Sequence, residues 1–310
     1  MRSESIRPAI ALLCAVSLAS CVKQPAPDEH ADHPPAVAVI PVTPAAAATT
    51  AVPAQVPVDD RSIPAGAELV AARLAASPRH AEWAMVPVEG GDSVRVWVVY
   101  PERSTNAPVV VVVHEIFGLS TWVRGVADQL AADGFIAIAP DYLTGKTTVP
   151  ADSLTMDAGR ALIRGLDPLE VVRRTAAAAE YGMSRPAAVR RYGVVGFCWG
   201  GSIVFEHAAR TPNLGAGVAF YGAPGQSTPL ADTRAPVLGL YGENDARVNA
   251  SIPRVDSTLR AAGRSFDHQI FPGAGHGFLR QQSGAAGANF AASQIAWPRT
   301  ISFFRTHLGQ

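Results

Sequence analysis

The stretch from Tyr192 to Arg210, YGVVGFCWGGSIVFEHAAR, decides the fold of this 310-residue chain. The run from Tyr192 to Gly196 is apolar and β-branched and predicts a buried strand, and the run from Gly200 to Arg210 predicts a helix. The short turn between them needs glycine, because no side chain fits where the two backbones approach. Cys198 stands at the tip of this turn, at the amino end of the helix, where the peptide dipoles favour an anion. The stretch therefore predicts a strand, a sharp turn that carries a nucleophile, and a helix.

Similar strands and helices alternate on both sides of this stretch. The expected strands span 93–100, 108–113, 135–139, 192–196, 216–221, 237–241 and 268–271, and the expected helices span 120–134, 168–182, 200–210 and 290–307. This alternation predicts an α/β fold, with a mostly parallel, doubly wound sheet and helices on both faces. Ligands bind such sheets beyond the carboxyl ends of the strands. The turn at Cys198 lies at such an end.

A nucleophile at such a turn needs a base and an acid that orients the base, and in chain order these follow the nucleophile. Asp245 leaves the predicted strand 237–241 and is the expected acid. Glu243, two residues earlier, is its rival, and a turn-forming aspartate is the structural alternative. His276 lies between two glycines in FPGAGHGF (271–278) and is the expected base. The alternatives are an exposed loop histidine at 276 and an inert, buried cysteine at 198.

The motif HEIFG (114–118) directly follows the valine-rich strand 108–113. The backbone amides of Ile116 and Trp199 are the expected oxyanion donors. Glu115 is the unusual residue, because a carboxylate at the end of a buried strand is costly unless it is paired or protonated. A salt bridge at the rim of the sheet is the simpler explanation of Glu115.

In this order, HEIFG (114–118), GFCWGG (196–201), GENDARV (242–248) and PGAGHGF (272–278) resemble the motifs of the dienelactone hydrolase family, within the α/β-hydrolase superfamily. The resemblance covers about residues 80 to 307. It implies a triad of Cys198, His276 and Asp245 that opens a lactone through an acyl-enzyme. It also implies that Glu115 helps to form the thiolate when substrate arrives.

Arg280 matches an arginine that binds the substrate carboxylate in dienelactone hydrolase. A second carboxylate-binding arginine of that enzyme has no secure counterpart here, although Arg160 and Arg164 lie in the corresponding region. The expected activity is that of a carboxylic ester hydrolase similar to carboxymethylenebutenolidase, with a small-molecule ester or lactone as substrate. A broad-specificity carboxylesterase or thioesterase, or a catalytically silent surface binding protein, is the alternative. No metal-ligand spacing is present, and no cofactor is expected.

The first twenty residues have the features of a secretory signal. Arg2 and Arg7 precede an apolar run that is too short to span a bilayer, and the run ends in Leu-Ala-Ser-Cys at residues 18–21. This ending resembles a bacterial lipobox, which implies cleavage before Cys21 and a lipid on its thiol. An ordinary signal peptide with a chance cysteine is the alternative. The expected organisation is a signal peptide at 1–20, a Pro/Ala-rich disordered tether at 21–66 and a hydrolase domain at 67–310.

The net charge and the cysteine count indicate which partners and which cellular compartment to expect. The formal net charge is zero, which gives no sign of a nucleic-acid partner. Cys14 would leave with the signal and Cys21 would carry lipid, so Cys198 would be the remaining thiol, with no partner for a disulfide. A lone thiol in an oxidising compartment needs a reason to persist, and catalysis is one. We expect a monomer in the bacterial cell envelope, facing the periplasm. Val22 after the cysteine favours the outer membrane.

Overall fold

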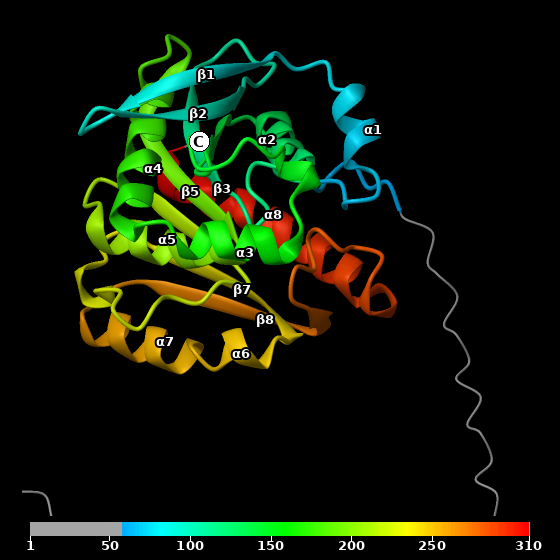
Figure 1. Cartoon of the computed structure of the whole chain (residues 1–310). Helices are drawn as coiled ribbons and strands as arrows, with labels where there is room; N and C mark the ends of the chain where they lie inside the picture. The colour runs from blue at the N-terminus through cyan, green and yellow to red at the C-terminus, as the bar shows by residue number, and fades with distance from the viewer. Residues whose placement is uncertain (1–57, 310) are drawn as a thin grey trace, which may run out of the picture. The chain divides into compact units, whose positions relative to one another are not determined.

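The structure is a computed structural model, and it describes residues 58–309 (Figure 1). The predicted signal peptide, the lipidation site Cys21 and most of the predicted tether lie outside the described residues. The predictions on those segments are therefore untested by the structure.

One eight-stranded sheet forms the centre of the domain, in the order β1-β2-β4-β3-β5-β6-β7-β8. β2 pairs antiparallel with both β1 and β4, and all later pairs are parallel, which confirms the predicted mostly parallel sheet. The strands are β1 (Ala81–Val88), β2 (Asp92–Val99), β3 (Ala107–Val113), β4 (Ile136–Asp141), β5 (Ala188–Phe197), β6 (Ala216–Phe220), β7 (Val237–Asn244) and β8 (Phe266–Gly275).

Helices cover both faces of this sheet, as predicted (Figure 1). Within residues 58–309, none of them is both long enough and apolar enough to cross a bilayer. The α-helices are α1 (Val70–Ala75), α2 (Thr121–Ala132), α3 (Met156–Arg164), α4 (Pro168–Met183), α5 (Trp199–Arg210), α6 (Ala246–Asn249), α7 (Ile252–Ala261) and α8 (Ala288–Leu308), and the 3-10 turns are η1 (Ala151–Ser153), η2 (Leu230–Asp232) and η3 (Ala285–Gly287).

The valines of β3 show how the core is divided. Val110 and Val112 face one side and pack in a cluster with residues of α2 and α8. Val109, Val111 and Val113 face the other side and join residues of α4, α5 and α7. Because side chains alternate along a strand, a run of five valines buries both faces at once. β3 is therefore the central strand that the sequence predicts.

The packed domain begins earlier than residue 67, the expected boundary. Ile63 is only 1% exposed. The carbonyl of Ala65 accepts a hydrogen bond from the indole of Trp122 at 3.2 Å, and the carbonyl of Pro64 accepts one from the side chain of Gln282 at 2.7 Å. The end of the predicted tether is thus part of the domain, because an isoleucine and two carbonyls find partners there.

Candidate active site

Cys198 lies in a sharp turn between β5 and α5, as the sequence predicts. Its backbone has φ 56° and ψ −112°, and its N–H donates to the carbonyl of Phe220 on β6 at 3.1 Å. A Cβ atom at Gly196 would lie 2.1 Å from the carbonyl oxygen of Gly200, and one at Gly200 would lie 2.3 Å from that of Val113. Both glycines are therefore required by the close approach of the backbones. The turn leaves the thiol partly exposed at the carboxyl edge of the sheet.

The imidazole of His276 connects this thiol to Asp245. Its Nδ1–H donates to Oδ2 of Asp245 at 2.5 Å, and the side chain of Cys198 lies close enough to the ring to raise its pKa. Asp245 is 7% exposed, whereas the His276 side chain is 35% exposed. Burial disfavours the charged imidazole, but the hydrogen bonds and the negative charge of these two partners outweigh it and raise the pKa of His276 to about 10. The structure thus brings the three predicted residues together, with His276 hydrogen-bonded to Asp245 and close to Cys198.

Glu243, the alternative candidate for the triad acid, contacts the backbone of β8 and not the ring of His276. It is exposed, and its Oε2 accepts a hydrogen bond from the backbone N–H of Gly273 on β8 at 2.8 Å. Asp245, two residues later, comes after the end of β7 and immediately before α6. Of the two carboxylates, the structure therefore places Asp245 beside His276.

Glu115 is buried and faces Arg280. The Glu115 residue is 5% exposed, and its Oε2 lies 3.5 Å from Nε of Arg280. This ion pair lacks hydrogen-bond geometry, so Oε2 has no hydrogen-bond partner among the described residues. Burial raises the pKa of Glu115 to about 7, although the positive charges of Arg280 and His276 act to lower it. Glu115 can therefore change its protonation state near neutral pH.

Arg280 extends from the loop after His276 and also lies over the ring of Phe117, with 5.0 Å between the guanidinium carbon and the ring centroid. Its side chain is 28% exposed, so an anion can reach it. Arg160 lies on α3, is more than half exposed and pairs with Asp157 of the same helix at 3.9 Å. No contact within the described residues joins Arg160 or Arg164 to Glu115. Arg280 is thus the arginine that the structure brings to the site.

The two expected oxyanion donors lie after the carboxyl end of β3 and at the amino end of α5, whose backbones approach closely at Val113 and Gly200. Within residues 58–309, neither the N–H of Ile116 nor that of Trp199 is used in a backbone hydrogen bond between elements. Trp199 is the first residue of α5, where N–H groups have no partner inside the helix. Both amides are therefore available to a ligand.

His114 is a site residue to which the sequence analysis gave no role. Its Nδ1 is 2.6 Å from the carbonyl oxygen of Glu115, and its Nε2 accepts a hydrogen bond from the N–H of Tyr142 at 3.2 Å. These partners fit a neutral ring that carries its proton on Nδ1, and burial lowers the pKa of His114. The Glu115 carbonyl and the Ile116 N–H belong to one peptide unit. By holding that carbonyl, His114 fixes the direction of the Ile116 N–H.

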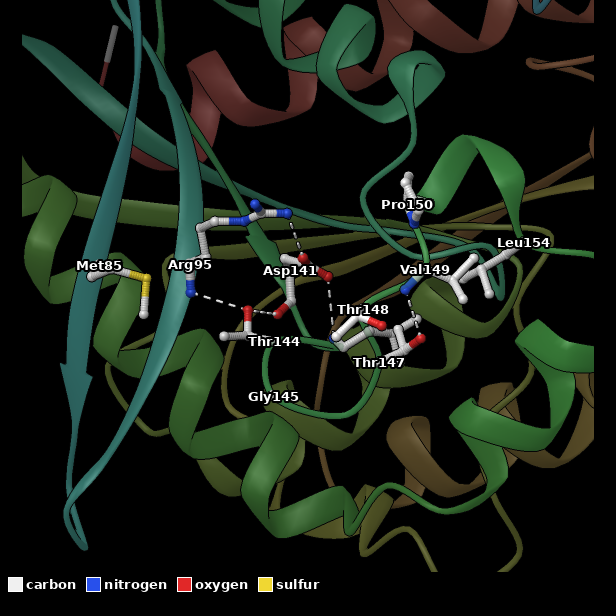
Figure 2. A pocket seen from close by; sticks show the side chains of 12 residues that line it. Met85, Arg95, Asp141, Thr144, Gly145, Thr147, Thr148, Val149, Pro150 and Leu154 are labelled. Atoms are coloured by element: carbon white, nitrogen blue, oxygen red, sulfur yellow. Dashed lines mark hydrogen bonds and ion pairs between the residues drawn. The ribbon is translucent and has the colours of Figure 1, made fainter.

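A pocket of about 370 Å³ lies beside the carboxyl end of β4 (Figure 2). On its wall, Arg95 pairs with Asp141 at 3.1 Å, and Thr144 accepts a hydrogen bond from the N–H of Arg95 at the same distance. Figure 2 shows these groups turned toward one another, so their charges compensate. Neither Cys198 nor His276 lines this pocket. It is therefore separate from the candidate active site.

Comparison with known proteins gives consistent results. The model of the dienelactone hydrolase family matches residues 94–308. A protein of Escherichia coli K12 assigned as a carboxymethylenebutenolidase is 32% identical over 234 residues, which are 71% of this chain and 85% of that protein. One from Synechocystis with the same assignment is 31% identical over 227 residues and is covered to 91%. The crystal structure of a Klebsiella pneumoniae protein assigned as a dienelactone hydrolase has a TM-score of 0.64 and 27% identity, over 73% of this chain and 98% of that chain.

Proposed function

Since the chain belongs to the dienelactone hydrolase family, we propose that it hydrolyses ester or lactone bonds through a covalent intermediate on Cys198. The observation that carries this proposal is that Cys198, in its sharp turn at the carboxyl edge of the sheet, lies beside His276, which is hydrogen-bonded to Asp245 at 2.5 Å. A nucleophile, a base and a group that orients the base are the parts that acyl transfer requires.

The reaction begins when the Cys198 thiolate attacks the carbonyl carbon of the substrate. The N–H groups of Ile116 and Trp199 stabilise the negative oxygen that forms. When the carbon–oxygen bond breaks, protonated His276 gives its proton to the leaving oxygen and an acyl-thioester remains. His276 then takes a proton from water, which attacks the thioester and releases the acid. Because a thiolate also leaves easily, activated esters, enol-lactones and thioesters are favoured over amides.

Glu115 and Arg280 suggest that the substrate carries a free carboxylate. A substrate carboxylate bound to Arg280 would remove the cation that faces Glu115 at 3.5 Å. The Glu115 carboxylate then becomes more basic and takes the thiol proton of Cys198, which yields the nucleophile when substrate is present. A pKa of Glu115 near 7 suits this exchange at neutral pH.

Two alternatives predict different behaviour. A broad-specificity carboxylesterase or thioesterase would use the same row of residues but would not discriminate for a free carboxylate. A catalytically silent surface binding protein would have no need of a thiol beside a histidine that is hydrogen-bonded to a buried aspartate. The arrangement around Cys198 therefore favours an enzyme, and the substrate panel below separates the two enzymes.

The decisive experiment compares the wild type with Cys198→Ala and Cys198→Ser on aryl esters and enol-lactones, each with and without a free carboxylate. We expect loss of turnover in the alanine variant and an acyl mass adduct on the Cys198 peptide of the wild type. Arg280→Leu should raise KM for the carboxylate-bearing substrates alone. Undiminished turnover by Cys198→Ala would rule out the mechanism, and an equal effect of Arg280→Leu on both substrate sets would favour the broad carboxylesterase.

We also infer that a lipid on Cys21 holds the protein in the bacterial cell envelope, facing the periplasm and on the outer membrane. The support is the sequence LASC at 18–21 and the Pro/Ala-rich segment that follows. Incorporation of labelled fatty acid into the wild type, and its loss in Cys21→Ala, tests this. A labelled Cys21→Ala variant would contradict the inference.

A further inference from the structure

Tyr221 follows β6 and has a backbone conformation that bulky residues seldom adopt. Its φ is 39°, in the left-handed region, which costs free energy for a residue with a large side chain. Its N–H nevertheless donates to the carbonyl of Leu240 on β7 at 2.8 Å, and the whole residue is buried. The surrounding structure therefore holds Tyr221 in place against its backbone preference. Such strain is commonly found at functional sites.

The ring of Tyr221 lies against the candidate base. Its centroid is 5.1 Å from that of the His276 ring and 5.4 Å from that of Phe278. Phe197 and Phe220 complete the aromatic cluster. Phenylalanine at 221 would provide the same packing, so the hydroxyl is the part that needs an explanation.

The Tyr221 hydroxyl is buried and has no hydrogen-bond partner among residues 58–309. Besides His276, whose ring it contacts, the charges of Glu115, Cys198 and Arg280 act on the pKa of Tyr221. Oε2 of Glu115 is likewise buried without a hydrogen bond. An unpaired buried polar group destabilises a fold, so two of them beside one active site indicate groups kept for a state other than the resting one.

We propose that Tyr221 is a positioning residue whose hydroxyl binds the Glu115 carboxyl once a substrate carboxylate occupies Arg280. The inference rests on the proposed function, because it describes how the same site responds to an anionic substrate. In the resting state Glu115 faces Arg280. When the anion takes Arg280, the carboxyl loses its cation and needs another partner in the same buried space.

A phenol suits this role in both protonation states of Glu115. Burial, together with the negative charges of Glu115 and Cys198, raises the pKa of Tyr221, so the hydroxyl keeps its proton and can donate to the carboxylate. After Glu115 has taken the proton of the Cys198 thiol, the phenol oxygen can accept a hydrogen bond from the neutral carboxyl. Tyr221 thus holds Glu115 near Cys198 through the proton transfer without exchanging a proton itself.

The test compares Tyr221→Phe with Tyr241→Phe, which is a matched control. Tyr241, on β7, is also fully buried, its hydroxyl has no hydrogen-bond partner among the described residues, and burial is the cause of its raised pKa. The probes are iodoacetate, whose carboxylate can occupy Arg280, and iodoacetamide, which is neutral. The rate of Cys198 alkylation is measured with each probe, together with kcat and KM on carboxylate-bearing and neutral esters.

We expect Tyr221→Phe to lower the iodoacetate-to-iodoacetamide rate ratio by about fivefold or more, the effect of losing one hydrogen bond. It should also lower kcat for the carboxylate-bearing ester with little change in KM. Tyr241→Phe should leave both unchanged, and the melting temperature of Tyr221→Phe should not fall. In a Glu115→Gln background, Tyr221→Phe should have no further effect on the ratio.

An unchanged ratio in Tyr221→Phe, or an equal fall in the Glu115→Gln background, would overturn the proposal. Because alkylation does not require ester hydrolysis, the test separates the two proposals. If the wild type hydrolyses no ester, but Tyr221→Phe still lowers the alkylation rate ratio as expected, the proposed function is refuted and the role of Tyr221 is supported.

Discussion

Among single residues, Glu115 has a charge that depends strongly on the fold. Its pKa is raised from an ordinary value of 4.5 to about 7, chiefly by burial. Between these two values the folded protein holds a proton that the unfolded chain has lost. The folded state binds more protons there, so stability falls as pH rises through this range. The site thus keeps a buried acid that destabilises the fold above neutral pH.

We predict that Glu115→Gln stabilises the protein at pH 8 and not at pH 4. The substitution keeps the shape of the side chain and removes the buried charge, so the gain at pH 8 should be about 1–3 kcal/mol. Urea unfolding of both proteins at pH 4, 6 and 8 measures it. A gain that is the same at all three pH values would contradict this origin.

The side chain of His114 gives a second prediction at this scale. In His114→Leu the Glu115 carbonyl loses its partner, and the Ile116 N–H is free to turn away from the oxyanion. We expect kcat to fall by about 10- to 100-fold with little change in KM, since one oxyanion donor is affected. Steady-state kinetics on an aryl ester measures this. A change confined to KM would show that His114 does not orient the donor.

At the scale of elements, α3 (Met156–Arg164) is held by a close backbone contact against the loop 114–118, which follows β3 and carries the Ile116 N–H. A Cβ atom at Gly159 would lie 2.5 Å from the carbonyl oxygen of Ile116. Gly159 and Ile163 are the buried residues of this helix, so little else fixes α3. The position of the Ile116–Phe117 peptide, which follows the peptide that carries the Ile116 N–H, therefore depends on the absence of a side chain at 159.

We predict that Gly159→Ala lowers kcat by about tenfold or more, because the added methyl group must displace α3 or the Ile116 carbonyl. Gly165→Ala is the control, since its Cβ would lie 3.4 Å from its nearest neighbour, the carbonyl of Leu162. Alanine favours a helix over glycine by about 1 kcal/mol, so loss of α3 itself does not explain the result. Equal kcat in the two variants would show that the contact with α3 does not determine the conformation of the loop that carries Ile116.

The elements also show what could be predicted from the sequence. The five valines of β3 and the glycines around Cys198 are local signals, and the predicted central strand and sharp turn are confirmed. β1 (Ala81–Val88) was not predicted, because an edge strand with alternating exposure that contains Pro87 lacks a continuous apolar run. α3 was missed because it buries so few residues.

Contacts between distant segments of the chain could not be predicted. His276 and Asp245 were found because each lies in a glycine-containing loop after a strand. The contacts of Tyr221 with His276 and of Glu115 with Arg280 depend on which strand ends meet. No local pattern specifies that arrangement. His114 could have been suspected, because a histidine at the end of a buried strand must satisfy two ring nitrogens.

At the scale of the whole molecule, two buried histidines make the stability of the fold sensitive to acid. His207 on α5 is fully buried, and its Nε2 lies 3.0 Å from the hydroxyl of Tyr192. Burial lowers its pKa from 6.5 to about 3, and burial also lowers the pKa of His114. Below pH 6.5 these two rings are protonated in the unfolded chain but stay neutral in the folded protein. The unfolded state therefore binds more protons, and stability falls as pH falls. Between pH 4.5 and 6.5 the raised pKa of Glu115 makes stability rise as pH falls, so it offsets the contribution of one of these two histidines.

We predict that His207→Gln flattens the loss of stability in acid. Each histidine that stays neutral only in the folded state contributes a slope of about 1.4 kcal/mol per pH unit below pH 6.5. At pH 7 the free energy of unfolding of the variant should be lower than that of the wild type, because glutamine fills the space of the ring imperfectly. This difference in free energy should shrink by about 3 kcal/mol by pH 4.5. Urea unfolding across this range gives the two curves, with His268→Gln, at an exposed position on β8, as the control. Parallel curves for His207→Gln and the wild type would mean that this ring is protonated in the folded protein, and the acid sensitivity would then have to come from His114.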